Sequence, residues 1–496
     1  MNHHARLLCG ALLICALASL GGASSAAPKS GYEPLGLYLT WQRDPSTTMT
    51  IDWHSLARER RTPYIQYRQR DRDGWMAALG ANHGFPFSDR VIHRVELEGL
   101  KPGTEYEFRF GPLSRVYRFR TMPRTLEVPV RFAVGGDVRR RQEWMEQTNR
   151  AAMAYDPDFI VWAGDLAYAD ALPERVDRWY EFFDAIKNTL IDEDGRVAPI
   201  LSAIGNHEVL DGTFHTHEGF EPTNAWRERI APYYFALFAF PGQPGYNILD
   251  FGDYMSIILL DTEHSNPMVG AQREWFASVL EERMGRPHVF PVYHVPAYPS
   301  HRPYTDVWST MVRSAWTSLM EDFGVELVFE AHDHTYKRTH PILGGEVHPD
   351  GVVYMGDGAW GVPTREVEPG GTRWYLADAQ SKRHFILVTL DGEDRQVHVV
   401  DEDGEYFDSW PPGLPAPLPR LRQPGGIVRD PAEVEPEFAD EDVNRDGAVN
   451  ALDVQILINA LLGLPIPPHA APDVTGNGRV EAQDLQRVIN AVLGIQ

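Results

Sequence analysis

The sequence contains little cysteine and few basic residues. Its two cysteines among 496 residues are Cys9 and Cys15. Two thiols are too few for a disulfide scaffold or a cysteine-based zinc module, so any metal site must use His, Asp, Asn or Tyr side chains. With 46 Lys and Arg against 70 Asp and Glu, the formal net charge is −24. A protein that coats DNA, RNA or an anionic membrane needs a basic surface, so the composition argues against these partners.

Long apolar runs are confined to the N-terminus. The stretch from Leu7 to Leu20 holds both cysteines and is followed by small residues up to Ala26 and Ala27. This pattern predicts a signal peptide over residues 1–26, because the run is too short for a membrane span. No later segment reaches the roughly 18 apolar residues of a transmembrane helix. We therefore expect a secreted, extracellular protein without a membrane span, with the periplasm or the cell surface as alternatives.

The composition favours several packed domains, since 43% of the residues are hydrophobic. Residues 33–122 form short runs of alternating apolar and polar residues, such as Leu37–Trp41 and Met49–Trp53, with turn residues between them. That pattern predicts an all-β sandwich. The segment Leu100–Phe110, with its Pro-Gly-Thr corner, resembles a turn and strand of fibronectin type III domains. These residues indicate a fold and carry no chemistry.

Residues 129–405 follow a different pattern, in which short apolar strands alternate with amphipathic helices. This alternation predicts an α/β layered domain. The expected helices are Gln142–Tyr155, Arg175–Ile186, Gln272–Glu282 and Trp308–Phe323.

Five short polar clusters end predicted strands of this domain. They are Gly136-Asp137, Gly164 to Tyr168, Gly205 to Glu208, His294, and Ala331 to Arg338. Each alone is explained by a turn, a helix cap or a surface histidine, but together they bring oxygen and imidazole groups to one sheet edge. The candidate ligands are Asp137, Asp165, Tyr168, Asn206, His294, His332 and His334. Seven ligands are too many for one zinc ion and suit two metal ions about 3.5–4 Å apart.

The five clusters, in this order, resemble the motifs of calcineurin-like metallophosphoesterases. Tyr168, three positions after Asp165, makes the set similar to the purple acid phosphatases in particular, as does the preceding fibronectin-like domain. The resemblance implies a four-layer αββα fold for residues 129–405. It implies that the first metal, Fe³⁺, is bound by Asp137, Asp165, Tyr168 and His334. It also implies that the second, Fe²⁺, Zn²⁺ or Mn²⁺, is bound by Asp165, Asn206, His294 and His332.

The resemblance further implies an acid phosphatase that hydrolyses phosphate monoesters by attack of metal-bound hydroxide. His207, next to Asn206, resembles the family's histidine that contacts the substrate and protonates the leaving group. His301, seven residues beyond His294, is a second candidate, with an ordinary loop histidine as the alternative. The sequence departs from the family at Arg139–Arg141, since the first motif usually has a glycine there, and one guanidinium could reach the substrate's phosphate.

Residues 411–436 contain eight prolines and are predicted to form a semi-rigid linker. Residues 437–496 then hold two acidic segments, which begin at Asp442 and Asp473, 31 residues apart, and each leads into a similar apolar helix. Gly447 and Gly478 stand at the sixth position, where calcium loops turn sharply. The candidate calcium ligands are Asp442, Asn444, Asp446, Asn450, Asp453, Asp473, Thr475, Asn477, Glu481 and Asp484.

The repeat resembles a type I dockerin domain. The resemblance implies a small α module with paired calcium loops that bind Ca²⁺ and stabilise the fold. It also implies docking onto a cohesin domain of another exported protein. A calcium-stabilised tail without a partner is the alternative.

The sequence thus predicts a multidomain, secreted phosphatase for small phosphate esters, tethered through its dockerin to a cohesin-bearing partner. One alternative is a phosphodiesterase or nucleotide pyrophosphatase that uses the same ligands. The other is a noncatalytic, surface-attached module, against which the complete ligand set argues.

Overall fold

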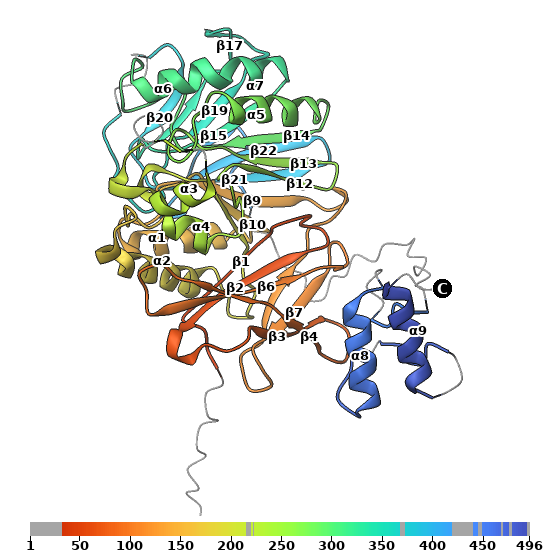
Figure 1. Cartoon of the computed structure of the whole chain (residues 1–496). Coiled ribbons are helices and arrows are strands. Elements are labelled where there is room, and N and C mark those ends of the chain that lie inside the picture. The colour runs from red at the N-terminus through yellow and green to blue at the C-terminus, as the bar shows by residue number, and fades with distance from the viewer. Residues whose placement is uncertain are drawn as a thin grey trace, which may run out of the picture.

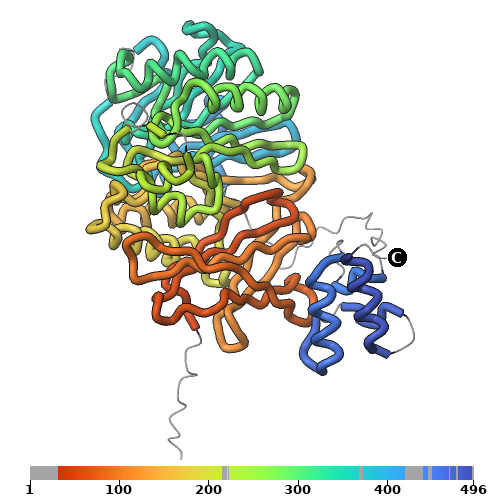
Figure 2. Tube along the Cα trace, viewed as in Figure 1, coloured from red at the N-terminus to blue at the C-terminus, as the bar shows by residue number. Residues whose placement is uncertain are grey.

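The computed structural model describes residues 32–214, 220–221, 223–367, 373–418, 440–444, 449–467, 470–475 and 479–493. The predicted signal peptide, the linker beyond residue 418 and the calcium candidates Asp446 and Asn477 lie outside the described residues. Within these ranges no helix combines the length and apolar character that crossing a bilayer requires. Figures 1 and 2 follow the chain from the red N-terminal strands to the blue C-terminal helices.

The N-terminal part is built from two four-stranded antiparallel sheets. The first has the order β1 (Gly36–Thr40), β2 (Met49–Leu56), β6 (Arg90–Leu97) and β5 (Ala81–Gly84). The second has the order β4 (Met76–Leu79), β3 (Tyr64–Gln69), β7 (Glu105–Arg109) and β8 (Tyr117–Arg120). The alternating pattern of the sequence therefore predicts these strands correctly.

The first of these sheets is buried on both faces. Ile51 and Trp53 of β2 belong to the core that faces the second sheet. On the opposite face Tyr38 stacks on Phe183 of helix α2 (Val176–Thr189), with ring centroids 4.7 Å apart. Aromatic pairs of this kind stabilise an interface beyond their buried area. The sandwich is thus joined to the central part of the chain by a packed apolar contact.

The central part contains two larger sheets. The six-stranded sheet has the order β11 (Ile200–Ser202), β10 (Phe159–Trp162), β9 (Val130–Gly135), β21 (His384–Asp391), β22 (Asp394–Asp401) and β23 (Tyr406–Trp410). The seven-stranded sheet has the order β12 (Asn247–Phe251), β13 (Met255–Leu259), β14 (His288–Val292), β15 (Leu327–Glu330), β19 (Val353–Gly356), β16 (Tyr336–Thr339) and β20 (Leu376–Gln380). A hairpin of β17 (Ile342–Leu343) and β18 (Glu346–Val347) extends beyond the second sheet.

Helices cover the outer faces of both sheets (Figure 1). Helix α1 (Gln142–Met153) and α2 pack on the six-stranded sheet, and α5 (Ala271–Glu281), α6 (Val307–Val312) and α7 (Ser318–Asp322) pack on the seven-stranded sheet. Two short helices, α3 (Asn224–Ile230) and α4 (Pro232–Leu237), connect the two halves. The predicted helix Trp308–Phe323 is interrupted by a π-helical turn at Arg313–Thr317. The prediction of a β-sandwich followed by an α/β domain is confirmed.

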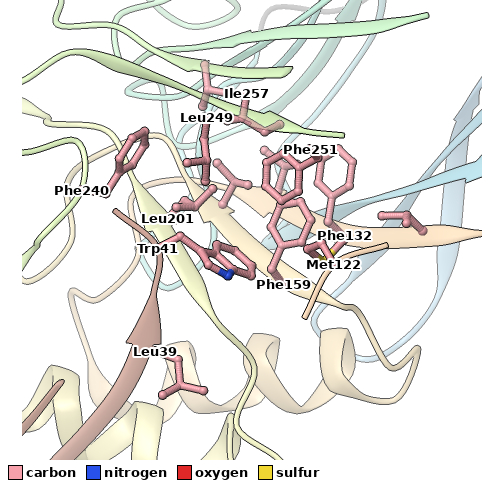
Figure 3. Close-up of a cluster of buried hydrophobic side chains, with 14 of the residues drawn as sticks. Leu39, Trp41, Met122, Phe132, Phe159, Leu201, Phe240, Leu249, Phe251 and Ile257 are labelled. Carbon is pink, nitrogen blue, oxygen red and sulfur yellow. The ribbon is translucent and has the colours of Figure 1, made fainter. Parts of the chain in front are cut away.

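One apolar core lies between the two central sheets and continues into the sandwich (Figure 3). Phe132 and Phe159 stack with ring centroids 4.9 Å apart, and Phe159 stacks on Phe251 at 5.0 Å. Trp41, directly after β1, is fully buried and meets both Phe159 and Phe251 edge to face at 5.7 Å. This tryptophan thus fixes the sandwich to both central sheets.

The C-terminal module has its own small core. Helices α8 (Ala451–Leu461) and α9 (Ala482–Leu493) pack together around Val443, Ile456, Leu457, Val474 and Val488. Because this core contains few buried side chains, it supplies little folding free energy. Bound ions would therefore contribute substantially to the stability of the module.

Replacing Trp41 with alanine should lower the free energy of unfolding by about 3–5 kcal/mol, because it leaves a cavity between the sandwich and both sheets. Denaturant unfolding followed by circular dichroism measures this loss. Leu113→Ala is the control, since Leu113 is 81% exposed and its removal should change the free energy by less than about 0.5 kcal/mol. Equal effects of the two substitutions would contradict the role given to Trp41.

Candidate metal centre

The seven predicted ligands all follow strands of the two central sheets. From the six-stranded sheet come Asp137 after β9, Asp165 and Tyr168 after β10, and Asn206 after β11; from the seven-stranded sheet come His294 after β14 and His332 and His334 after β15. Strands β9, β10 and β11 run parallel, as do β14 and β15, so the carboxyl ends of each set lie at one edge. The structure brings all seven side chains together where these two edges meet.

The backbone at this edge is unusual. Five of the seven residues have a positive φ, namely Asp137 (55°), Asp165 (55°), Tyr168 (56°), His332 (79°) and His334 (59°). Residues other than glycine rarely adopt this region, because the Cβ atom crowds the backbone. Such strain persists where the surrounding structure enforces it, and it concentrates at functional sites.

Asp137, Tyr168 and His334 form a first group of ligand atoms. The Tyr168 hydroxyl donates a hydrogen bond to Asp137 Oδ1 at 2.8 Å and lies 3.1 Å from His334 Nε2. His334 Nε2 is also 2.9 Å from the same Asp137 oxygen. Three groups from three loops therefore converge on one point.

A second group surrounds the imidazole of His294. Its Nε2 lies 3.3 Å from Asp165 Oδ2, 3.2 Å from Asn206 Oδ1 and 3.0 Å from His332 Nδ1. The Nδ1 atom of His294 lies 2.8 Å from the Ala163 carbonyl oxygen, which can only accept a hydrogen bond. This contact makes Nδ1 the donor and orients the ring, a common support for a metal-binding histidine.

Both groups have the chemistry of metal ligands. The ligand atoms of Asp165, His294 and His332 lie within 4.8 Å of one another, and all three side chains are buried. Buried carboxylates and imidazoles crowded in this way are stable when a cation lies among them. The oxygen-rich set with Tyr168 suits a hard cation, whereas the imidazole-rich set suits a divalent transition metal. The residues present therefore fit a pair of metal ions.

The charges within the second group point the same way. Burial acts to raise the pKa of Asp165, but His294 and His207 reverse this and hold it well below its usual range. Burial acts to lower the pKa of His294, but Asp165 raises it to about 9. Asp165 thus favours positive charge at His294, and a metal cation at this place would supply that charge.

His207 lies against the centre without belonging to either ligand group. Its backbone N–H donates to Asp165 Oδ1 at 2.8 Å, and its ring stands over that of Tyr168 with centroids 4.3 Å apart. Its Nδ1 atom forms a hydrogen bond with the Asp170 carboxylate. Asp170 thereby orients the His207 ring so that its Nε2 atom faces the ligand groups. This atom lies 3.9 Å from Asp165 Oδ2.

Glu208 supports the ligand loops, a role that the sequence did not reveal. Its buried carboxylate accepts hydrogen bonds from the backbone N–H groups of Asp165, Leu166 and Gly205, at 2.7–2.8 Å. It thus ties together the loops after β10 and β11. The one available signal was its place next to His207 in the third cluster.

A buried ion cluster supports the loops of the other sheet. Lys337 is fully buried and forms ion pairs with Glu330 and Asp357. Its Nζ atom lies 3.0 Å from Asp357 Oδ1. These residues lie at the end of β15, in β16 and after β19, on either side of the histidine ligands. Separating a buried charge from its partner strongly destabilises a protein, because the charge is left unpaired. The cluster therefore fixes these three segments relative to one another.

His301 is placed differently from His207. Its Nδ1 atom donates a hydrogen bond to the Glu366 carbonyl oxygen at 2.8 Å, and its side chain is exposed. Its backbone N–H donates to Asp333 Oδ2 at 2.7 Å. Within the described part of the chain, no hydrogen bond or ion pair joins the His301 ring to any of the seven ligands.

The two calcium-loop candidates share one hydrogen-bonding pattern. Asp453 accepts from the backbone N–H of Asn444 at 3.1 Å and of Asn450 at 2.8 Å. In the second loop Asp484 accepts from the N–H of Thr475 and of Glu481, both at 2.8 Å. Asp442, Asp453 and Asp484 are buried, whereas Asp473 and Glu481 are half-buried. In each repeat, the described residues at the third and ninth positions therefore donate to a buried carboxylate at the twelfth position.

Three family models match consecutive parts of the chain. The N-terminal domain of purple acid phosphatases matches residues 34–121, the calcineurin-like phosphoesterase family matches residues 130–336, and the dockerin type I domain matches residues 440–493.

Curated relatives and a solved structure agree with the two phosphatase matches. Purple acid phosphatase 21 of Arabidopsis thaliana is 28% identical over 285 residues, which cover 55% of this chain and 60% of that protein. Acid phosphatase type 7 of Homo sapiens is 27% identical over 441 residues, which cover 78% of this chain and 91% of that protein. The structure of purple acid phosphatase PPD1 from yellow lupin seeds matches with a TM-score of 0.62 at 18% identity, covering 75% of this chain and 73% of that chain, which supports the fold.

Replacing Gly358 with alanine should displace the Asp137 carboxylate. A Cβ atom at Gly358 would lie 1.9 Å from Asp137 Oδ2, whereas a Cβ atom at Gly392 meets nothing within 4 Å. The two glycines have φ angles of +66° and +62°, so both substitutions carry the same backbone cost and only Gly358→Ala disturbs the ligand. We expect Gly358→Ala to lower the transition-metal content of the purified protein about tenfold or more, and Gly392→Ala to preserve it. Elemental analysis of both variants measures this, and full metal content in Gly358→Ala would contradict the role of Asp137.

Proposed function

We propose that the chain, a purple acid phosphatase-like metallophosphoesterase with a C-terminal dockerin type I domain, hydrolyses phosphate monoesters at a two-metal centre. The observation that carries the proposal is the convergence of seven ligand-type side chains from both sheets, with contacts of 2.8–3.3 Å within each group. The matched region covers only 60% of the length of the first Arabidopsis relative, so the activity is an inference for this chain.

The two groups of side chains divide between two metals in this proposal. Asp137, Asp165, Tyr168 and His334 would hold Fe³⁺, and Asp165, Asn206, His294 and His332 would hold Fe²⁺, Zn²⁺ or Mn²⁺. When bound, such a pair lowers the pKa of water and neutralises charge on a phosphate ester. The proposed domain boundaries are 33–122, 129–405 and 437–496, with a linker at 411–436.

The chain's own residues position and protonate the substrate. His207 presents Nε2 toward the centre while Asp170 holds its Nδ1 atom, so His207 can donate a proton to the leaving oxygen of the ester. Glu208 and the Lys337 cluster keep the ligand loops in place, which reduces reorganisation during the reaction. His301, held by the Glu366 carbonyl, is a weaker candidate for a proton donor.

The C-terminal module supports a tethered enzyme. Paired loops around the buried Asp453 and Asp484 suit Ca²⁺, whose ligands are oxygen atoms. We propose that this module docks onto a cohesin domain, and that the whole chain is exported. Both proposals depend on the dockerin match at residues 440–493.

Replacing His294 with alanine should abolish hydrolysis of an aryl phosphate, lowering kcat/KM about 100-fold or more, because it removes the centre of the second ligand group. His288→Ala is the matched control. His288 is equally buried and precedes the same strand's apolar run, but it lies at the opposite end of β14 and bonds to the Gly392 carbonyl oxygen. His288→Ala should keep most of the activity.

Retained activity in His294→Ala would refute the proposed centre. Comparing turnover of an aryl monoester with that of an aryl diester on one preparation separates a phosphatase from a phosphodiesterase. Faster turnover of the diester would favour a phosphodiesterase that uses the same metal ligands.

Calcium titration of the full chain should show two sites, of which Asp453→Ala and Asp484→Ala each remove one, because each carboxylate holds its own loop. Isothermal titration calorimetry measures the stoichiometry. Asp440→Ala is the control, since Asp440 is exposed and pairs with Arg487 at 3.0 Å outside both loops. Unchanged stoichiometry in both loop variants would refute the calcium sites.

A further inference from the structure

Three consecutive arginines after the first motif point in different directions. Arg139 is buried and forms an ion pair with Glu181. Arg141 is exposed, lies 3.7 Å from Glu143 and covers the ring of Trp144 at 4.7 Å. The Arg140 guanidinium instead lies 5.6 Å from the centre of the ring of Tyr168, one of the candidate ligands.

A second guanidinium approaches the same side from the other sheet. The backbone N–H of Arg365 donates to the His334 carbonyl oxygen at 3.0 Å, and its guanidinium donates to the His332 carbonyl oxygen at 3.2 Å. The two loops are joined, because the backbone N–H of Arg140 donates to the Gly361 carbonyl oxygen at 2.9 Å. Arg140 and Arg365 therefore stand beside the Tyr168 and His334 ligands.

Positive charge gathers around these two residues. Arg178, from α2, donates a hydrogen bond to the Tyr168 carbonyl oxygen. In the parts of the chain that the structure describes, no ion pair joins Arg140, Arg178 or Arg365 to a carboxylate. Unpaired cations this close together repel one another, and in a chain of net charge −24 they mark a place that favours an anion.

We propose that Arg140 and Arg365 form a subsite that binds a second phosphate group of the substrate, beside the phosphoryl group that the metal centre holds. The inference rests on the proposed function, and it deepens it by naming the residues of this chain that would favour substrates with two neighbouring phosphate groups. A guanidinium group suits this role because its planar fork matches two oxygens of a phosphate group. Hydrolysis at the centre then leaves the second phosphate on the product.

Arg140 is the cleaner residue to test, because the Arg365 guanidinium also supports the His332 carbonyl oxygen. Calorimetric titration of inorganic pyrophosphate and of orthophosphate into the metal-containing full chain compares two phosphate groups with one. We expect wild-type protein to bind pyrophosphate more tightly. Arg140→Ala should weaken pyrophosphate about tenfold and orthophosphate less than about twofold. Arg141→Ala, which changes the adjacent exposed arginine, should change neither affinity.

Arg140→Lys keeps the charge and loses the fork, so its pyrophosphate affinity should lie between those of wild type and Arg140→Ala. Equal weakening of both anions by Arg140→Ala would place Arg140 on the hydrolysed phosphoryl group and overturn the subsite, as would no weakening at all. Aryl phosphate turnover by the wild type is measured in parallel. Absent turnover with a selective loss of pyrophosphate affinity in Arg140→Ala would refute the proposed function and leave the subsite in place.

Discussion

The buried carboxylate of Asp137 holds the two halves of the central fold together at the site. It receives the Tyr168 hydroxyl from its own sheet on one oxygen and the His332 backbone N–H from the facing sheet on the other. Only glycine fits at position 358, because any side chain there would occupy the space of this carboxylate. The left-handed backbone at Asp137, Tyr168 and His332 is the cost of bringing these groups to one point. The packed core between the sheets, with Phe132, Phe159 and Phe251, stabilises the fold enough to offset this backbone strain.

The distribution of charge is compatible with the proposal that an acidic chain binds an anionic substrate. The net charge of −24 is spread over the whole sequence, whereas Arg140, Arg178 and Arg365 are concentrated around Tyr168. Guanidinium groups at short range add positive potential there, whereas solvent screens the remote carboxylates. Bound metal cations would add to the same field. The global charge therefore argues against polyanionic partners, whereas the local charge supports the proposed binding of a small anion.

The ligand clusters could be predicted from the sequence because each directly follows an apolar strand, and parallel strands end at a common edge. The strands and most helices followed from periodicity for the same local reason. The supporting groups could not be predicted in this way. Lys337, Glu330 and Asp357 come from three strand ends, and their pairing depends on the sheet order β15-β19-β16. The different directions of Arg139, Arg140 and Arg141 depend on Glu181, Tyr168 and Trp144, contacts that sequence spacing does not encode.

Both proposed cation sites use the same device, a carboxylate aimed by backbone N–H groups. His207 N–H holds Asp165 and His332 N–H holds Asp137, while pairs of loop N–H groups hold Asp453 and Asp484. Such donors cannot rotate away, so they fix the carboxylate before a cation arrives and reduce the entropy lost on binding. Burial acts to raise the pKa of Asp484, but the hydrogen bonds from Glu481 and Thr475 outweigh this effect and lower it. In a chain with only two cysteines, backbone hydrogen bonds would thus fix the carboxylates of both proposed cation sites without the help of disulfides.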